Sequence, residues 1–261
     1  ALEELPGREG LPAELSEAIL GGIAIVLYRR LAGGDHEGIV GLAPELDAWT
    51  LAVPNPPGPL RTRARRSLPR RGARADEEAG LLPAERVLRA LVALVAERGY
   101  AATTIAAIST RARISQNTFY KHFRDKGAAL EAAIEAGAAQ FLAATIPAIR
   151  RHGSWPGAAR SGLEAACAWL AAEPDWAHLL CVETYAVGPH AVRRRDRERG
   201  RLLAALAETA PPDAMLEPLA MEATFGAVQA LAYRRVRARD LAALAEIPPL
   251  ATYLLVAPAA G

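Results

Sequence analysis

The sequence is poor in the residues on which several protein classes depend. Its two cysteines, Cys167 and Cys181, provide no disulfide framework and suit a reducing cytoplasm. Aromatic residues make up 5% of the chain, and alternating runs of Val, Ile and Thr are scarce, which argues against a β-sandwich or barrel. The longest apolar run, Ala18 to Tyr28, is too short to span a bilayer, for which about 20 residues are needed. No secretory signal pattern opens the chain, so we expect a cytoplasmic protein without a membrane partner.

The motifs of common enzymes are also missing. The sequence contains no GxSxG, Walker or GxGxxG pattern. Its five histidines are scattered; His178 and Cys181 share a face of a predicted helix, but no third ligand follows at the spacing of a metal site. Cys167 is interpreted as a small buried hydrophobic residue. We therefore expect no catalytic residue, no metal and no other cofactor.

Apolar residues, by contrast, are abundant. Of the 261 residues, 51% are hydrophobic and 23% are charged, which is enough to bury a core in one or two domains. The net charge of +2 hides an asymmetry: residues 55–126 hold fifteen basic and six acidic residues, and the remainder holds 16 basic and 23 acidic ones. A basic block between acidic segments is typical of a module that binds a polyanion, although a solvated Arg-rich linker would give the same counts.

Composition divides the chain into four segments. Residues 55–81 predict a linker, because NPPGP and RTRARRSLPRRGAR lack apolar periodicity and cannot bury enough surface to offset the loss of backbone entropy. The arginines at positions 61, 63, 65, 66, 70, 71 and 74 favour disorder with weak attraction to phosphate over an ordered minor-groove arm. Residues 1–54, 82–127 and 128–261 are helical by pattern, which predicts an all-α fold.

The first segment repeats the end of the last one. When residues 17–30 are moved by 205 positions, six of them meet identical residues, and one gap extends the match further. The identities pair Glu17, Ala18, Gly21, Tyr28, Arg29 and Arg30 with Glu222, Ala223, Gly226, Tyr233, Arg234 and Arg235, and Pro44, Leu46, Leu51 and Pro54 with Pro248, Leu250, Leu255 and Pro258, while Trp49 meets Tyr253. We interpret residues 1–54 as the last two helices of a preceding copy of the same unit.

This repeat predicts a contact within the chain. We expect helices 11–31 and 38–54 to pack against helices 213–236 and 240–257 as an intramolecular pseudodimer, because an exposed apolar helix invites aggregation. The contact would join Ile19, Leu20, Ile23, Val26 and Leu27 to Phe225, Val228, Leu231 and Leu254. The chain begins with Ala and not Met, which fits a piece of a longer tandem protein; a chance likeness of two apolar hairpins is the alternative.

Residues 82–112 predict two helices. Pro83 suits a first helical turn, and Gly99 is expected to end the helix in a left-handed conformation. Thr103 is expected to cap a second, shorter helix that buries Ile105 and Ile108. The first helix carries one apolar stripe at helical spacing, formed by Val87, Leu88, Leu91, Val92 and Val95.

A turn at residues 113–115 leads to a third helix at 116–123. Its Phe119 and Phe123 face the core, and the short helix, the turn and this helix together form a helix-turn-helix unit. The other faces carry amide, hydroxyl, imidazole and ammonium groups, which bond to base edges and phosphates. These groups belong to Gln116, Asn117, Thr118, Tyr120, Lys121 and His122. A core helix whose polar side simply meets water is the alternative.

The run ERVLRALVALVAERGYAATTIAAISTRARISQNTFYKHFRDKGAAL resembles the DNA-binding domain of the tetracycline-repressor (TetR/AcrR) family. The matching points are the GYAATT turn, Ile105, Ile108, Ile114-Ser115, Thr118-Phe119-Tyr120, His122-Phe123 and Lys126. The resemblance implies double-stranded DNA as the partner. It places Gln116, Asn117, Thr118, Tyr120 and His122 at the major groove, Thr104 and Lys126 on phosphates, and Ser115 and Lys121 within the same surface.

The sequence departs from the family pattern at three positions. Arg113 stands where the family usually has Gly, and a left-handed residue other than Gly costs about 1 kcal/mol there. Arg113 would instead add a phosphate contact. Asn117 replaces a frequent Gly or Pro, and Gly127 replaces a frequent Glu.

Residues 128–261 resemble the family's effector and dimerisation domain in length and helix count. The family's last two helices pair with those of a partner subunit in a four-helix bundle. The resemblance implies a repressor released by a small apolar effector. Ligand sites form between bundle helices, although aromatic residues at helical spacing are also typical of cores. The candidate pocket residues are Trp155, Trp169, Trp176, Tyr185 and Tyr233. A helical ligand-binding or dimerisation module with a degenerate DNA-binding head is the alternative.

Overall fold

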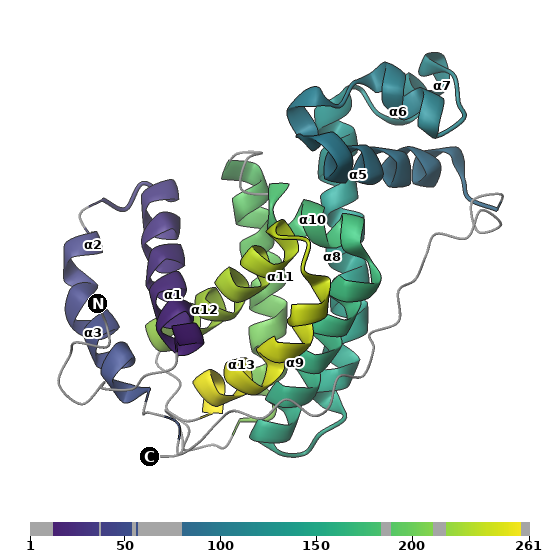
Figure 1. Ribbon diagram of the computed structural model, residues 1–261. Coiled ribbons are helices and arrows are strands. Elements are labelled where there is room, and N and C mark those ends of the chain that lie inside the picture. Colours follow the sequence, from purple (N-terminus) through teal and green to yellow (C-terminus); the bar gives the residue numbers. More distant parts are fainter. Residues whose placement is uncertain are drawn as a thin grey trace.

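The computed structural model describes residues 13–36, 38–53, 56, 80–183, 189–210 and 218–256, and every regular element in these ranges is a helix. The predicted all-α fold is confirmed. Three groups of helices follow one another along the chain (Figure 1). The hairpin consists of α1 (Ala13–Ala32), α2 (Gly38–Gly41) and α3 (Ala43–Ala52); the head of α5 (Pro83–Ala102), α6 (Ile105–Arg111) and α7 (Gln116–His122); and the body of α8 (Lys126–Arg150), α9 (Trp155–Ala172), α10 (Pro174–Cys181), α11 (Pro189–Ala207), α12 (Pro218–Arg237), the 3-10 helix η3 (Leu241–Glu246) and α13 (Ile247–Val256).

The head folds around one aromatic side chain. Phe119 on α7 is fully buried, and it shares a core with Val87 and Leu91 of α5 and Ile108 of α6. Phe123 is partly buried and packs against the same cluster, with its ring 5.8 Å from that of Phe119. The register predicted for the third helix is therefore confirmed.

Two local predictions in the head need correction. The N-cap of α6 is Thr104, whose hydroxyl accepts a hydrogen bond from the Ala107 amide, and not Thr103. The buried Thr103 hydroxyl instead donates to the Gly99 carbonyl at 2.9 Å. Gly99 does have a positive φ of 81°, but its ψ of 161° is extended and not left-handed helical. The chain thus bends at Gly99 before α6 begins.

Helix α8 joins the head to the body. Ala129 and Leu130 near its start belong to the core of the head, whereas Leu142 and Ile149 further along belong to a core shared with α9 and α11. Among the described helices, α8 is also the one that is long and apolar enough to cross a membrane. Because residues of α8 are buried in both cores, α8 is a central packing helix.

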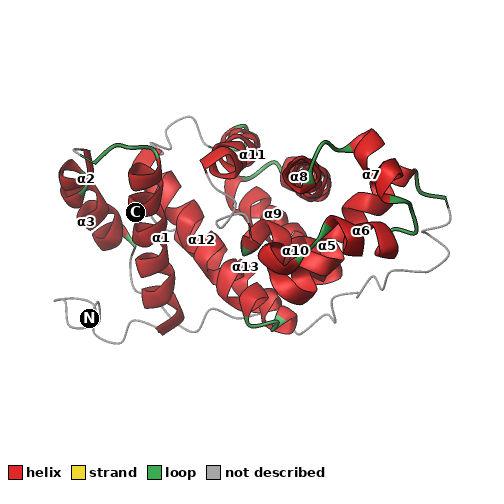
Figure 2. Ribbon diagram, turned by 90° about the horizontal axis from the view of Figure 1, so that it is seen from above, coloured by secondary structure: helices red, strands yellow, loops and turns green. Residues whose placement is uncertain are grey.

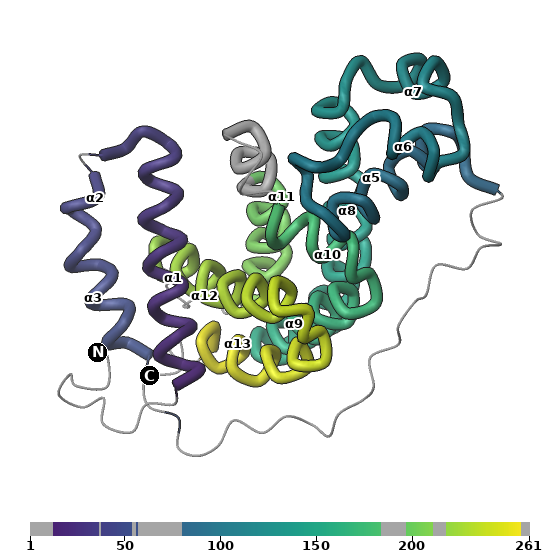
Figure 3. Tube along the Cα trace, turned by 45° about the horizontal axis from the view of Figure 1, so that its top comes forward, coloured from purple at the N-terminus to yellow at the C-terminus, as the bar shows by residue number. Residues whose placement is uncertain are grey.

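The hairpin packs on α12. Figures 2 and 3 show α1 beside α12, and Figure 2 places the hairpin and α7 at opposite ends of the molecule. Ile19 and Val26 of α1 are buried in one cluster with Leu231 of α12 and Leu254 of α13. The indole of Trp49 on α3 donates a hydrogen bond to the Thr224 hydroxyl at 3.0 Å.

Contacts between α1 and α12 are related by the internal repeat. Arg29 pairs with Glu222, and Arg234 pairs with Glu17. Because Arg29 corresponds to Arg234 and Glu17 to Glu222 in the repeat, the two ion pairs are equivalent. A Cβ placed on Gly21 would meet Ala230, and one placed on Gly226 would meet Ile25, again the same pair exchanged. Such reciprocity is the signature of an isologous, two-fold interface.

Two residues of the predicted contact lie elsewhere. Leu20 faces away from α12 and is 51% exposed. Phe225 packs against a second cluster within the body, around Leu142 and Trp155. The helical period explains both, because residues 20 and 225 are equivalent in the repeat and point away from the axis between the copies.

Candidate functional site

Helix α7 presents a polar, exposed surface. Tyr120 is 53% exposed, and the other exposed side chains on this helix are Gln116, Asn117, Lys121 and His122. Thr118 is half-buried, and its backbone amide donates to the Ser115 hydroxyl at 3.0 Å. Ser115 is thus the N-cap of α7. The buried Phe119 anchors the helix while its polar side chains remain available to a partner.

The turn before α7 holds an arginine in an unusual conformation. Arg113 has a φ of 53°, in the left-handed region that favours glycine. Its amide donates to the Thr110 carbonyl, and the Ile114 amide donates to the Ser109 carbonyl, so the turn ends α6 with a tight reversal. The side chain of Arg113 is exposed beside α7. Arg113 therefore adopts the left-handed conformation expected at this position, in a strained turn that two backbone hydrogen bonds close.

Two of the residues expected on phosphates, Lys126 and Thr104, have partners within the chain. The Lys126 ammonium donates to the carbonyls of Tyr100 and Thr103, at 2.9 and 2.7 Å, and lies 4.1 Å from the centre of the Tyr100 ring. It thereby satisfies carbonyls at the bend between α5 and α6. Thr104 caps α6 and remains exposed. Contacts of these residues with phosphate stay a prediction.

The body encloses an apolar cavity of about 200 Å³. It lies between α8, α9, α10, α11, α12 and α13, and hydrocarbon side chains dominate the wall. Arg199 and Glu198 of α11, Gln229 of α12 and Thr145 of α8 are the polar residues on it. The principal apolar residues are Phe141, Leu142, Leu163, Leu170, Leu202 and Phe225.

None of the described aromatic residues predicted for a pocket lines this cavity. Trp155 and Trp176 are buried in two different cores, and Trp169 packs edge-on against Phe141 with ring centres 5.4 Å apart. Tyr233 accepts a hydrogen bond from Arg237 at 2.9 Å. Tyr185 lies outside the described residues.

The residues that do line the cavity were not predicted from the sequence. They are ordinary Leu, Ala and Phe positions, and nothing in a single sequence distinguishes a cavity wall from a packed core. Both cysteines lie on the wall, and burial raises the pKa of the Cys167 thiol to about 12. No group of three or more His, Cys, Asp or Glu side chains in the described parts of the chain could hold a metal ion.

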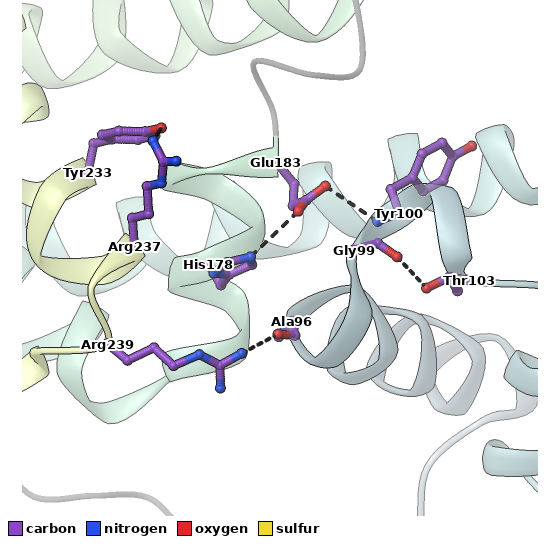
Figure 4. A network of polar contacts seen from close by, with 9 residues as sticks. All are labelled: Ala96, Gly99, Tyr100, Thr103, His178, Glu183, Tyr233, Arg237 and Arg239. Carbon is purple, nitrogen blue, oxygen red and sulfur yellow. Dashed lines mark hydrogen bonds and ion pairs between the residues drawn. The ribbon is translucent and has the colours of Figure 1, made fainter.

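Polar contacts connect the body to the head (Figure 4). The Arg239 guanidinium donates to the Ala96 carbonyl at 2.6 Å, near the end of α5. Glu183 accepts a hydrogen bond from the Tyr100 amide at 3.4 Å and lies 3.5 Å from the His178 imidazole. Arg239 follows α12 and has a φ of 57°, which is a strained conformation for a residue other than glycine. Its hydrogen bond therefore connects a strained backbone position directly to the head.

Helix α10 contributes to the cavity wall, to the core of the head and to the cluster that joins the hairpin to α12. Its Leu180 and Cys181 line the cavity, its Trp176 and Leu179 belong to the core of the head, and its Ala177 is buried against the hairpin and α12 cluster. A shift of this eight-residue helix would therefore move cavity wall and head together.

Residues 87–133 match the family model described as "Bacterial regulatory proteins, tetR family". This range contains α6, α7 and most of α5, and therefore the exposed polar helix. A search of the curated proteins gave no match.

Several solved structures share the fold. FadR from Bacillus halodurans, a fatty acid degradation regulator, has a TM-score of 0.57 at 19% identity, over 66% of this chain and 94% of that one. FadR from Bacillus subtilis, in complex with stearoyl-CoA, has a TM-score of 0.55 at 17% identity, over 64% and 97%. A TetR-like regulator from Rhodococcus sp. RHA1 has a TM-score of 0.51 at 22% identity, over 65% and 93%.

Proposed function

We propose that the chain is a TetR-family transcriptional regulator, and that it acts in the cytoplasm as a repressor that a small apolar effector releases from its operator. The observation that carries this proposal is α7. Its buried Phe119 anchors the helix, and its exposed amide, phenol, ammonium and imidazole groups can form hydrogen bonds with base edges. Such an anchored polar helix is the form in which a helix-turn-helix unit enters the major groove.

We propose that the side chains on and around α7 divide the work at the operator. Gln116 and Tyr120 reach base edges, and Asn117, Thr118, Lys121 and His122 contact the groove and its borders. The backbone phosphates are contacted by Thr104, Arg113, Ser115 and Lys126. Phosphate contacts fix the register of a protein on DNA, whereas contacts with bases select the sequence.

The proposed effector site is the cavity in the body. Its wall is formed almost wholly by hydrocarbon, so it suits an apolar molecule. The FadR of Bacillus subtilis, which shares this fold, is known in complex with stearoyl-CoA, a molecule with a long apolar chain. We propose that a ligand displaces α10 through Leu180 and Cys181, and that α10 then turns the head through Trp176 and Leu179.

The function is tested by selecting genomic DNA with the full chain. We expect a shared operator motif, and the variant Tyr120→Ala should bind it more weakly by about 1–3 kcal/mol. Tyr28→Ala, which removes an exposed tyrosine from the distant hairpin, is the matched control and should bind normally. Unchanged affinity of Tyr120→Ala would remove α7 from the interface.

A salt series separates the repressor from a module whose head no longer binds DNA. Specific binding should fall steeply between about 50 and 200 mM salt and keep a preference for the operator. A degenerate head would show no such preference. For the effector, Ala166→Phe should fill the cavity and abolish release by apolar compounds while operator binding persists.

We further propose that the hairpin is a built-in dimerisation partner. The family's dimers join the last two helices of two subunits, and here α1 and α3 make reciprocal contacts with α12 in place of a second subunit. The chain with its own α12 covered should then be a monomer in solution, and an intact tandem parent would bind an asymmetric operator. Sedimentation equilibrium decides this: a tight symmetric dimer built on residues 218–256 would contradict it.

A further inference from the structure

The hairpin leaves one apolar face uncovered. Along α1, Leu20, Tyr28 and Leu31 are 51%, 40% and 50% exposed, and Ala24 between them is exposed as well. Leu51 on α3 is 64% exposed. The α1 residues recur every three or four positions and therefore form one stripe on the side away from α12. Among the described residues of this outer face, Leu20, Leu31 and Leu51 are thus half exposed or more.

The same positions are covered in the second copy of the repeat. With the shift of 205, Leu20 corresponds to Phe225 and Leu31 to Val236, and with the shift of 204 that aligns the second helices, Leu51 corresponds to Leu255. Val236 and Leu255 are 3% and 8% exposed. Three of the corresponding residues, Phe225, Gln229 and Leu255, line the cavity of the body. The outer face of the hairpin is thus the counterpart of a cavity wall.

A charged contact shows the same difference between the copies. Glu222 is 16% exposed because Arg29, Arg30 and Arg199 surround its carboxylate, and Arg199 comes from α11 of the body. The equivalent Glu17 meets Arg234 but is 33% exposed. Arg199 of α11 thus covers Glu222 on one side, and the corresponding side of Glu17 is more exposed.

We infer that the outer face of the hairpin binds a helical body built like α8 to α11 of this chain but without helices equivalent to α12 and α13. Such a body uses α1 and α3 as its last two helices and closes a second apolar cavity against Leu20 and Leu51. A second copy of this chain does not fit, because its own α12 and α13 already cover the corresponding surface of its body.

The charges on the hairpin define the occupant further. Asp47 is exposed on α3 at the position where α13 carries the buried Ala251. A body that packs here offers a basic or hydrogen-bonding residue opposite Asp47, since a buried carboxylate without a partner is strongly unfavourable. It also offers a basic residue opposite Glu17, in the role that Arg199 has opposite Glu222. The expected partner surface is therefore apolar, with a basic position opposite Glu17 and a basic or hydrogen-bonding position opposite Asp47.

This inference rests on the proposed role of the hairpin as a built-in partner, and photo-cross-linking tests it separately. The full chain, produced at its natural level in its own host, carries p-benzoylphenylalanine in place of Leu20 or Leu51. The control position is Ala32, which is exposed and whose counterpart Arg237 is exposed too. After irradiation, the linked peptides are identified by mass spectrometry.

We expect Leu20 and Leu51 to link to helical peptides whose sequence resembles residues 126–207 but differs from them, at least ten times more often than Ala32 does. Peptides of this chain itself, peptides of an unrelated protein, or yields equal to the Ala32 control would overturn the inference. The sedimentation measurement remains independent of this result. A monomer that gives no specific link retains the built-in partner and loses only the second body.

Discussion

At the scale of single residues, the head depends on Phe119. The side chain is fully buried between α5 and α6, and its neighbour Tyr120 on the same helix is 53% exposed. The two rings lie 5.5 Å apart, edge to face. One aromatic residue therefore holds α7 in place while the next one remains free to meet a partner.

We predict that Phe119→Ala lowers the free energy of unfolding by about 3–5 kcal/mol, because it leaves a cavity in the centre of the head. Tyr120→Ala should change it by less than about 1 kcal/mol, since an exposed ring contributes little packing. Urea denaturation followed by circular dichroism measures both. Equal stability of the two variants would contradict the register assigned to α7.

Cys167 on the cavity wall is predicted to be unreactive. Burial raises the pKa of the Cys167 thiol to about 12, so the nucleophilic thiolate is scarce at neutral pH. In the native chain, iodoacetamide at pH 8 should label Cys167 far more slowly than in urea, where the pKa returns to its ordinary value. Peptide mass spectrometry follows the labelling. Rapid labelling of Cys167 in the native chain would show that the cavity admits solvent and reagent freely.

At the scale of elements, the turn between α6 and α7 combines strain with charge. Arg113 occupies a conformation with a φ of 53°, which costs about 1 kcal/mol for a residue with a Cβ. Ordinary turn chemistry does not explain an arginine there. A phosphate contact made by its exposed side chain would.

We predict that Arg113→Gly keeps or slightly raises the stability of the head, because glycine adopts this φ without strain. The same variant should bind all DNA more weakly and reduce the salt slope of binding by about one unit. Thermal unfolding and a salt series of fluorescence anisotropy give the two readouts. Unchanged DNA affinity would leave Arg113 without the phosphate contact proposed for it.

Helices and core residues of the head could be predicted because they depend on local spacing. The stripe from Val87 to Val95, the Ser115 turn and the buried Phe119 follow from periods that a sequence displays directly. The cap at Thr104 was missed by one residue, since adjacent threonines have equal propensity and the bend at Gly99 decides between them. The cavity could not be predicted, because it depends on how six helices fail to fill the space between them.

At the scale of the whole molecule, the repeat in the sequence becomes a symmetric contact in space. The reciprocal pairs Arg29 with Glu222 and Arg234 with Glu17 tie α1 to α12 at both ends of their crossing. Small residues let the two backbones approach between these pairs. A Cβ on Gly22 would lie 2.4 Å from the Ala223 carbonyl oxygen and 2.9 Å from the Trp49 ring, so only glycine fits there.

Gly22→Leu should force α1 away from α12, because the obstructing atom belongs to rigid backbone. The apolar face of α12 around Ala223, Ala227 and Leu231 would then be exposed, and two chains should pair through it. Sedimentation equilibrium should therefore show a monomer for the parent chain and a concentration-dependent dimer for the variant. Gly41→Leu is the matched control, since a Cβ at Gly41 meets nothing within 4 Å, and it should stay monomeric. If Gly22→Leu remained a monomer with the melting temperature of the parent, α1 would not be the element that covers the dimerisation face of α12.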